Sequence, residues 1–238
     1  MYLLIDAGNT RVKFAGHDGQ HWLFEQAEAH DALQLALPAC FEPHSVHWLS
    51  VADEALNARI ASLLGPHAQR MTRVRASAAA AGLRNDYAQP TQLGADRWAA
   101  AVGAWHQVQG ACLVVSAGTA TTVDVISAEG VFEGGCILPG LDMMRAALAS
   151  GTAALPFAEG RLVARPRNTA DAIYAGCLHA QLGAIERMRA SLPAGAPLLL
   201  AGGAAGVLRE HLAEPLVWAP RLVLEGLLQI ARSAPVAS

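Results

Sequence analysis

Residues 3–14, LLIDAGNTRVKF, place a set of reactive and polar groups directly after an apolar run. The carboxylate of Asp6 ends the run, and Gly8 lets backbone N–H groups approach a ligand closely. The turn continues with donor and cationic side chains: Asn9, Thr10, Arg11 and Lys13. This combination suits phosphate oxygens, and an acid at the end of a buried strand suits a hydrated Mg2+ that bridges them. A tight hairpin whose Asn and Thr side chains cap only their own backbone is the alternative interpretation.

The same pattern recurs 110 residues later in LVVSAGTATTVD, residues 113–124. Each copy has three apolar residues, a short polar residue, Ala-Gly, and then hydroxyl or amide side chains. In the second copy the donors are Thr119, Thr121 and Thr122. The repeat predicts two related α/β domains, residues 1–110 and 111–238, that face each other across a cleft. Because both copies carry the glycine turn, the repeat favours phosphate binding over hairpin capping alone.

Two other nucleotide-binding signatures do not occur, since the sequence contains neither GxxxxGK[ST] nor GxGxxG. A third apolar run, PLLLAGGAAGVLREHL at 197–212, delivers a pair of glycines to the start of a predicted helix. Its AGGAAG stretch is typical of a close strand–helix turn, and it would also suit the flat face of an adenosine.

The segment LGADRWAAAVGAW, residues 93–105, places Asp96 and Arg97 in the first turn of a predicted helix that follows Gly94. Asp96 suits a simple interaction with the helix dipole, and it equally suits the orientation and deprotonation of an attacking hydroxyl group. A cation in the first turn opposes the helix dipole, so Arg97 predicts an anionic partner such as a substrate carboxylate.

Hydrophobic periodicity predicts the elements that position these groups. Strands are predicted over residues 2–6, 12–15 and 46–51, and helices over 53–64, 96–108 and 169–192. The last helix begins in RNTADAI, where Asn168 or Thr169 is the N-cap and the other residue is free for a ligand. GGCILPG at 134–140 is expected to form a turn.

Composition limits the classes of function. The chain has 238 residues, 53% of them apolar, and a formal net charge of -3, so neither disorder nor nucleic-acid binding is expected. Its four cysteines show no metal-ligand spacing and favour a reduced, cytoplasmic protein. No segment offers the roughly 18 apolar residues that a membrane-spanning helix needs. We therefore expect a small-molecule ligand, and neither a membrane nor a nucleic acid as a partner.

Five motifs in the order DAGNT, LGADRW, SAGTATTVD, GGCILPG and RNTADAI, together with Lys13, resemble those of the type III pantothenate kinases, which include the Bvg accessory factor branch. The resemblance covers nearly the whole chain. It implies two actin-like α/β domains of the acetate and sugar kinase and Hsp70 type (ribonuclease H-like), with ATP in the interdomain cleft, in a homodimer. The family reaction is ATP-dependent phosphorylation of pantothenate at its terminal hydroxyl, the first step toward coenzyme A.

The resemblance also implies the residues of the site. The first phosphate-binding turn consists of Asp6, Ala7, Gly8, Asn9, Thr10, Arg11, Val12 and Lys13, and the second contains Gly118 and Thr119. The implied pantothenate contacts are Tyr87, Gly94, Ala95, Asp96, Arg97 and Thr169, with Asp96 as the proton acceptor. The substrate roles of Tyr87 and Thr169 come from the resemblance alone.

One position departs from the family pattern. The family commonly has an acid, which holds a monovalent cation, where this chain has Ser116. The repeat aligns Ser116 with Asp6, and a hydroxyl is a neutral ligand that supplies no negative charge. The cofactors implied are ATP, Mg2+ and K+ or NH4+, and Ser116 puts the monovalent cation in doubt. Asp124 is the residue that would partly replace the missing acid.

Two other functions are compatible with the sequence. A phosphatase of the same fold would use Asp96 to activate water, and analysis of the product would separate it from a kinase. A non-catalytic nucleotide-binding accessory protein would act through a partner, as the accessory-factor branch and Ser116 suggest. That protein would bind ATP without releasing ADP in response to an acceptor.

Overall fold

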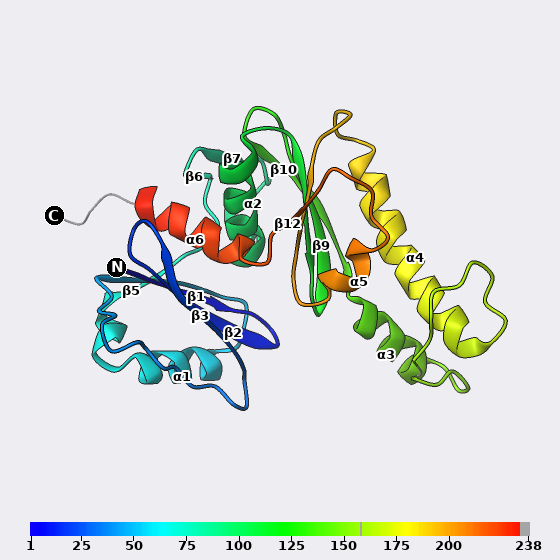
Figure 1. Cartoon of the computed structure of the whole chain (residues 1–238), viewed down its shortest axis with the longest axis horizontal. Coiled ribbons are helices and arrows are strands. Elements are labelled where there is room, and N and C mark those ends of the chain that lie inside the picture. Colours follow the sequence, from blue (N-terminus) through cyan, green and yellow to red (C-terminus); the bar gives the residue numbers. More distant parts are fainter. Residues whose placement is uncertain (158, 234–238) are drawn as a thin grey trace. The chain divides into compact units, whose positions relative to one another are not determined.

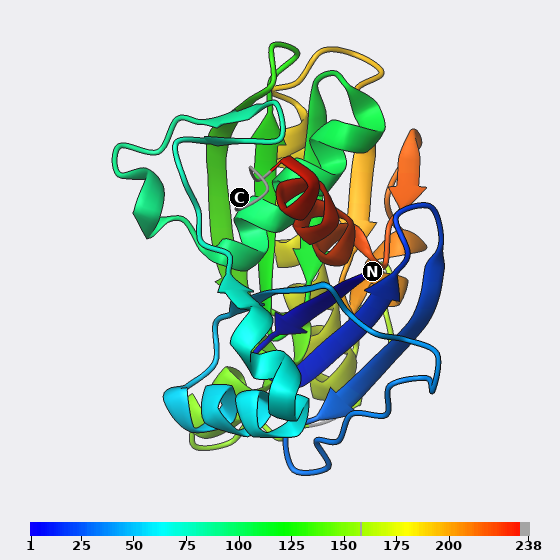
Figure 2. The same ribbon diagram turned by 90° about the vertical axis from the view of Figure 1, so that its left-hand side faces the viewer.

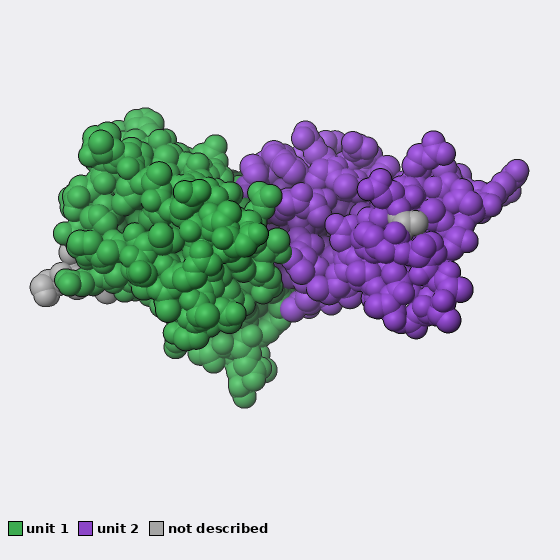
Figure 3. Space-filling model, turned by 90° about the horizontal axis from the view of Figure 1, so that it is seen from below, with its two compact units in different colours: residues 1–109, 130–132, 221–238 green, residues 110–129, 133–220 purple. Residues whose placement is uncertain are grey.

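The computed structural model describes residues 1–157 and 159–233, which belong to two compact units. Unit 1 contains residues 1–109, 130–132 and 221–233. Unit 2 contains residues 110–129 and 133–220. Figure 3 colours unit 1 green and unit 2 purple. The five-stranded sheet belongs to unit 1 and most of the seven-stranded sheet belongs to unit 2, and each unit is described separately below.

The sheet of unit 1 has the strand order β3-β2-β1-β4-β5. Its strands are β1 (Tyr2–Ala7), β2 (Arg11–His17), β3 (Trp22–Ala29), β4 (Ser45–Ser50) and β5 (Met71–Arg73). β1, β2 and β3 are antiparallel neighbours, whereas β1, β4 and β5 are parallel neighbours. The expected strands at 2–6, 12–15 and 46–51 are therefore present, with ends that differ by a few residues.

Helices cover both faces of this sheet (Figure 1). These helices are α1 (Glu54–Leu64), α2 (Ala95–Val108) and α6 (Leu222–Ser233). Unit 1 also contains two short strands, β6 (Ala79–Ala80) and β7 (Leu83–Asn85), and 3-10 turns at Gly65–Arg70 and Pro90–Gln92. Leu3 and Ile5 belong to the core that α1 covers, and Leu4 belongs to the core under α2 and α6. Because side chains alternate along a strand, Asp6 lies on the same face as Leu4. The end of β1 thus presents its acid on the side of α2.

The helices α2 and α6 pack backbone against backbone, and Figure 2 shows α6 in red beside the blue strands of its sheet. A Cβ atom at Gly226 would overlap the carbonyl oxygen of Ala99, and one at Gly103 would overlap the carbonyl oxygen of Leu222. Glycine at these positions permits the close approach. The contact holds α2, whose first turn carries Asp96 and Arg97, against the sheet.

Unit 2 repeats this arrangement. The second sheet has seven strands in the order β12-β11-β8-β9-β10-β7-β6, and unit 2 contains β12, β11, β8, β9 and most of β10. The strands are β8 (Cys112–Ala117), β9 (Ala120–Ile126), β10 (Val131–Pro139), β11 (Leu198–Ala201) and β12 (Leu216–Trp218), and the helices are α3 (Leu141–Gly151), α4 (Thr169–Arg189) and α5 (Ala205–Arg209). β8 is antiparallel to β9 and parallel to β11, and β11 is parallel to β12. The first two residues of β10, Val131 and Phe132, pair with β7 inside unit 1.

The two strand orders correspond one to one, with β1 matching β8, β2 matching β9 and β4 matching β11. The sequence repeat therefore reflects a duplicated fold, as expected. The expected helices are also present. Helix α1 has Asp53 as its N-cap, α2 begins at Ala95, and α4 ends at Arg189, three residues before the predicted end at Leu192. Turn hydrogen bonds from the N–H groups of Ser191 and Leu192 replace the last helical turn before Pro193.

The division into units differs from the expected halves 1–110 and 111–238 at the C-terminus of the chain. Helix α6 belongs to unit 1, because Leu224 and Leu227 pack in the core that contains Leu4 and Ala99. The proposed boundary near residue 110 stays a prediction about folding domains. In the described part of the chain no helix combines the length and the apolar character needed to cross a membrane.

Candidate functional site

The first glycine turn joins β1 to β2. The N–H group of Gly8 donates to the carbonyl oxygen of Arg11 at 3.0 Å, and this bond closes the turn. The side chains of Asn9, Thr10 and Arg11 are exposed. A Cβ at Gly8 would lie 3.3 Å from the carbonyl oxygen of Arg11, so a side chain would crowd the turn. The turn has the shape and the donors that phosphate oxygens need.

A histidine that the sequence did not single out supports this turn. His30, which follows β3, places Nε2 3.0 Å from the carbonyl oxygen of Gly8. Because a carbonyl oxygen only accepts, Nε2 carries the hydrogen in this contact. The carbonyl oxygen of His30 in turn accepts from Arg59 of α1 at 2.7 Å. No motif marks His30, since the fold alone brings it to the turn.

Asp6 stands in a strongly perturbed environment. Its side chain is buried, at 9% exposure, and burial raises the pKa of this carboxyl group to about 6. The positive charge of Lys13, its partner across the β1–β2 ladder, lowers the pKa, and the negative charge of Asp96 raises it. Asp6 and Asp96 therefore lie close enough to interact. A divalent cation would compensate the buried negative charge, so this environment fits Mg2+.

Asp96 lies in the first turn of α2, where the helix dipole favours an anion. Gly94 is the N-cap, and its carbonyl oxygen accepts from the N–H group of Trp98 at 2.9 Å. A Cβ at Gly94 would lie 2.7 Å from Oδ1 of Asp96, so the missing side chain leaves room for the carboxylate. Asp96 is half-buried, which leaves it accessible to a hydroxyl group of a ligand.

Arg97 is held by aromatic side chains. It is buried, at 6% exposure, and its Nη1 donates to the hydroxyl oxygen of Tyr87 at 2.8 Å. The guanidinium carbon lies 5.7 Å from the ring centres of both Tyr87 and Phe132, within the range of cation–π attraction. No sequence motif marks Phe132, because only the pairing of β10 with β7 brings it to this place. The arrangement fixes a positive charge beside Asp96.

The second glycine turn, between β8 and β9, is one residue shorter than the first. Its closing bond runs from the N–H group of Gly118 to the carbonyl oxygen of Ala120 at 3.0 Å, and Gly118 and Thr119 are exposed. Ser116 pairs with Thr122 in the ladder position that Asp6 and Lys13 occupy in unit 1. Two charged residues of the first hairpin are thus replaced by hydroxyl groups.

Two of the donors expected in the second turn lie elsewhere. Thr121 and Thr122 are at 2% and 9% exposure, so their side chains are inside unit 2. They belong to β9, because the shorter turn starts that strand at Ala120. Of the expected donors in this copy, only Thr119 is exposed for a ligand.

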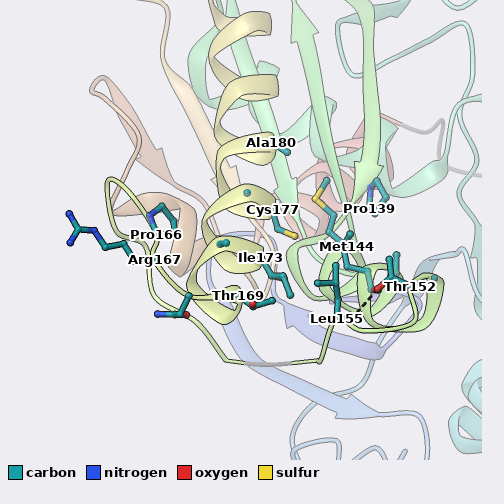
Figure 4. Close-up of a pocket in the computed structure, with 16 residues that line it drawn as sticks. Pro139, Met144, Thr152, Leu155, Pro166, Arg167, Thr169, Ile173, Cys177 and Ala180 are labelled. Carbon is teal, nitrogen blue, oxygen red and sulfur yellow. Dashed lines mark hydrogen bonds between the residues drawn. The ribbon is translucent and has the colours of Figure 1, made fainter.

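Thr169 belongs to a large cavity of unit 2. The side chain of Asn168 accepts from the N–H group of Asp171 at 2.9 Å, so Asn168 is the N-cap of α4 and Thr169 is left for other contacts. The cavity has a volume of about 1090 Å3 and lies between α3 and α4. Its walls are mostly apolar, as Figure 4 shows for Met144, Leu155, Ile173 and Cys177. No sequence motif indicates a cavity at this place.

The structure therefore collects the candidate residues into groups. Unit 1 holds the first turn, Asp96, and the contact of Tyr87 with Arg97. Unit 2 holds Ser116, Gly118 and Thr119 in one hairpin, and Thr169 at the start of α4.

Comparisons with known proteins agree on one family and one fold. The family model of the type III pantothenate kinases matches residues 2–191. A type III pantothenate kinase of Aromatoleum aromaticum is 52% identical over 239 residues, which cover 98% of each chain. A solved structure of a conserved putative Baf family transcriptional activator from Campylobacter jejuni has a TM-score of 0.61 at 21% identity and 97% coverage of each chain. A putative 2-dehydro-3-deoxygalactonokinase protein from Sinorhizobium meliloti has a TM-score of 0.59 at 14% identity and 98% coverage of each chain. These two structures confirm the expected actin-like and sugar-kinase fold.

Proposed function

The chain belongs to the type III pantothenate kinase family, and we propose that it transfers the γ-phosphate of ATP to the terminal hydroxyl group of pantothenate. The product is phosphopantothenate, and the reaction is the first step of coenzyme A biosynthesis. The enzyme is a kinase whose acceptor is an alcohol.

The main observation that supports this proposal is the position of Asp96. Unit 1 contains an exposed glycine turn with phosphate-binding donors, the buried acid Asp6 and the half-buried acid Asp96. The two acids interact electrostatically. Arg97, held by Tyr87, adds a fixed positive charge next to Asp96. A phosphate donor, a hydroxyl acceptor and a substrate carboxylate are the partners that this set of groups would bind.

Asp6 would hold Mg2+ through water, and the ion would neutralise charge on the phosphate groups. The turn from Asp6 to Lys13 would bind phosphate oxygens through its N–H groups, Asn9, Thr10 and the charge of Lys13. From unit 2, Gly118 and Thr119 would supply further donors to the phosphates.

The protein contributes little covalent chemistry to phosphoryl transfer. The residues position the acceptor hydroxyl in line with the γ-phosphate and stabilise the developing charge. Asp96 orients the hydroxyl group and takes its proton late in the transfer. Arg97, supported by Tyr87, binds the carboxylate of pantothenate, and Gly94, Ala95 and Thr169 are further substrate contacts.

The proposed mechanism uses no monovalent cation. The hairpin of unit 2 has the neutral Ser116 where a carboxylate would be needed, and its ladder partner Thr122 is also neutral. Asp124, the expected partial replacement for the acid, lies on the same sheet face as Ser116 by register. It is almost completely buried, however, and its carboxylate lies where a Cβ at Gly135 would be in contact with it. We propose a kinase that does not require K+ or NH4+.

A cytoplasmic homodimer completes the proposal. The exposed large apolar side chains of unit 2 include Ile137, Met143 and Phe157. A second copy of the chain would bury such side chains, and the family resemblance implies a dimer. Analytical ultracentrifugation would measure the oligomeric state.

The deciding experiment measures ADP release from MgATP with and without pantothenate, in K+ and in Na+, with the product identified by mass. Pantothenate-dependent ADP together with phosphopantothenate is expected, at similar rates in both salts. ADP and inorganic phosphate without dependence on pantothenate would indicate a phosphatase. ATP binding without turnover in either salt would contradict the kinase and favour the accessory protein.

A further inference from the structure

We infer that Gln181 is a positioning residue for the second phosphate turn, Gly118–Thr119, and this inference rests on the proposed function of that turn. Gln181 lies in the middle of α4 and is almost completely buried, at 1% exposure. It belongs to none of the motifs discussed above. A buried amide in an apolar core is costly unless it forms hydrogen bonds, so its contacts indicate why it is there.

The amide group of Gln181 holds the junction between β10 and α3. Its Nε2 donates to the carbonyl oxygen of Pro139 at 2.6 Å and lies 3.6 Å from Sδ of Met144. Pro139 ends β10, and Met144 lies in the first turns of α3. Figure 4 shows Pro139 and Met144 on the cavity wall that faces the Ala180 turn of α4. One side chain thus ties α4 to both sides of the junction.

The junction in turn supports the second phosphate turn. The N–H group of Gly140, the residue after Pro139, donates to the carbonyl oxygen of Thr119 at 2.9 Å. A Cβ at Gly140 would lie 2.6 Å from that oxygen and would overlap the carbonyl oxygen of Gly118. The two backbones are therefore in direct contact, and a shift of Pro139 must move the turn.

The other side of Gln181 faces the strands that carry the turn. A small cavity of about 10 Å3 is lined by Gln181, by Ala117 at the end of β8 and by Thr121 at the start of β9. Oε1 of Gln181 has no hydrogen-bond partner within the described residues. Gln181 therefore borders the turn both at the junction and behind its two strands.

The test replaces Gln181 by methionine, which has a similar length and lacks the donor. Ile185→Met is the matched control, since Ile185 lies one turn further along α4 in the same core and is completely buried. We expect Gln181→Met to weaken binding of a non-hydrolysable ATP analogue with Mg2+ by about 3- to 10-fold, the loss of one net hydrogen bond. The KM for MgATP should rise similarly, while the KM for pantothenate and the affinity of Ile185→Met for the analogue should stay near the wild-type values.

Calorimetric titration of the analogue separates the possible outcomes. Unchanged binding by Gln181→Met, or equal weakening in both variants, would overturn the inference, because a packing defect alone would then explain the data. Should Gln181→Met fail to fold, Gln181→Asn, whose shorter amide cannot span the same distance, carries the same expectation. The two proposals can also fail separately. If the wild-type protein makes no phosphopantothenate, the kinase is refuted. If Gln181→Met alone then binds the analogue more weakly, the role of Gln181 is still supported.

Discussion

Asp6 and Asp96 are carboxyl groups of the same unit in different environments. Asp6 is buried at the end of β1 opposite Lys13, and burial raises its pKa to about 6. Asp96 is half-buried and lies at the positive end of the α2 dipole. A desolvated acid is stabilised by a bound cation, whereas a partly solvated acid is accessible to the hydroxyl group of a substrate. Their different environments therefore support different roles for the same residue type.

Replacement of Asp96 by asparagine removes the proton acceptor with little change in size. We expect kcat to fall by about 100-fold or more. Binding of MgATP should be retained, because the negative charge of Asp96 raises the pKa of Asp6, and its loss keeps Asp6 ionised. Steady-state kinetics and titration with an ATP analogue measure the two effects. Glu54→Gln, an exposed acid in the first turn of α1, is the control, and normal turnover of Asp96→Asn would remove Asp96 from the mechanism.

Asp6 links activity and stability to pH in opposite directions. Its pKa is raised from 3.8 to about 6, so the fold favours the protonated acid. The associated stability is complete below about pH 4 and is lost as the pH rises through about 6. Cation binding needs the carboxylate, so kcat/KM should fall as the pH drops below about 6.

Asp6→Asn should accordingly abolish activity and stabilise the metal-free protein at pH 8. The expected gain in the free energy of unfolding is on the order of 1 to 3 kcal/mol, and it should vanish near pH 4. Urea denaturation at both pH values measures it. Asp18→Asn is the control, because the pKa of Asp18 is shifted in the opposite direction from that of Asp6. The N–H groups of His21 and Gln20 lower the pKa of Asp18 to about 2. Equal stability of Asp6→Asn and wild type at pH 8 would contradict the prediction.

At the scale of elements, local signals predicted most of what the structure contains. The local signals include the apolar run at residues 2–6, the acid Asp53 before an apolar helix pattern, and Asn168 before α4. Each acts within a few neighbouring residues. Such signals depend on helix-capping hydrogen bonds and on the periodicity of apolar side chains, and both can be recognised in a sequence. The contacts of His30 with Gly8 and of Phe132 with Arg97 join residues far apart in the chain, so no local pattern marks them.

The crossing of α2 and α6 allows a matched pair of substitutions. Gly226→Ala places a methyl group against the carbonyl oxygen of Ala99, so the helices must separate. We expect a loss of about 2 to 4 kcal/mol in the free energy of unfolding and a lower kcat, because α2 carries Asp96. Gly183→Ala on α4 meets no atom within 4 Å and should gain up to about 1 kcal/mol from helix propensity. Thermal and urea unfolding distinguish the two, and equal effects would contradict the packing argument.

At the scale of the molecule, the repeat of 110 residues predicted the duplication but not the membership of each unit. A repeat reports which segments fold alike, whereas a compact unit is defined by which apolar faces cover each other. Helix α6 follows β12 in the chain, and its residues Leu224 and Leu227 pack in the core that contains Leu4. The return of the chain to unit 1 could not be read from either copy of the repeat.

This return makes the C-terminal helix a structural requirement of unit 1. A chain that ends at Pro220 would leave the α2 face around Ala99 and the sheet face around Leu4 without their cover. We expect it to lose cooperative unfolding of unit 1 and to bind a hydrophobic dye, and we expect a peptide of residues 221–233 added in trans to reverse both changes. A peptide with Leu224→Asp, which places a charge in the buried contact, should fail. Near-UV circular dichroism and thermal melts measure the rescue, and a native melt of the shortened chain without peptide would show that unit 1 folds without α6.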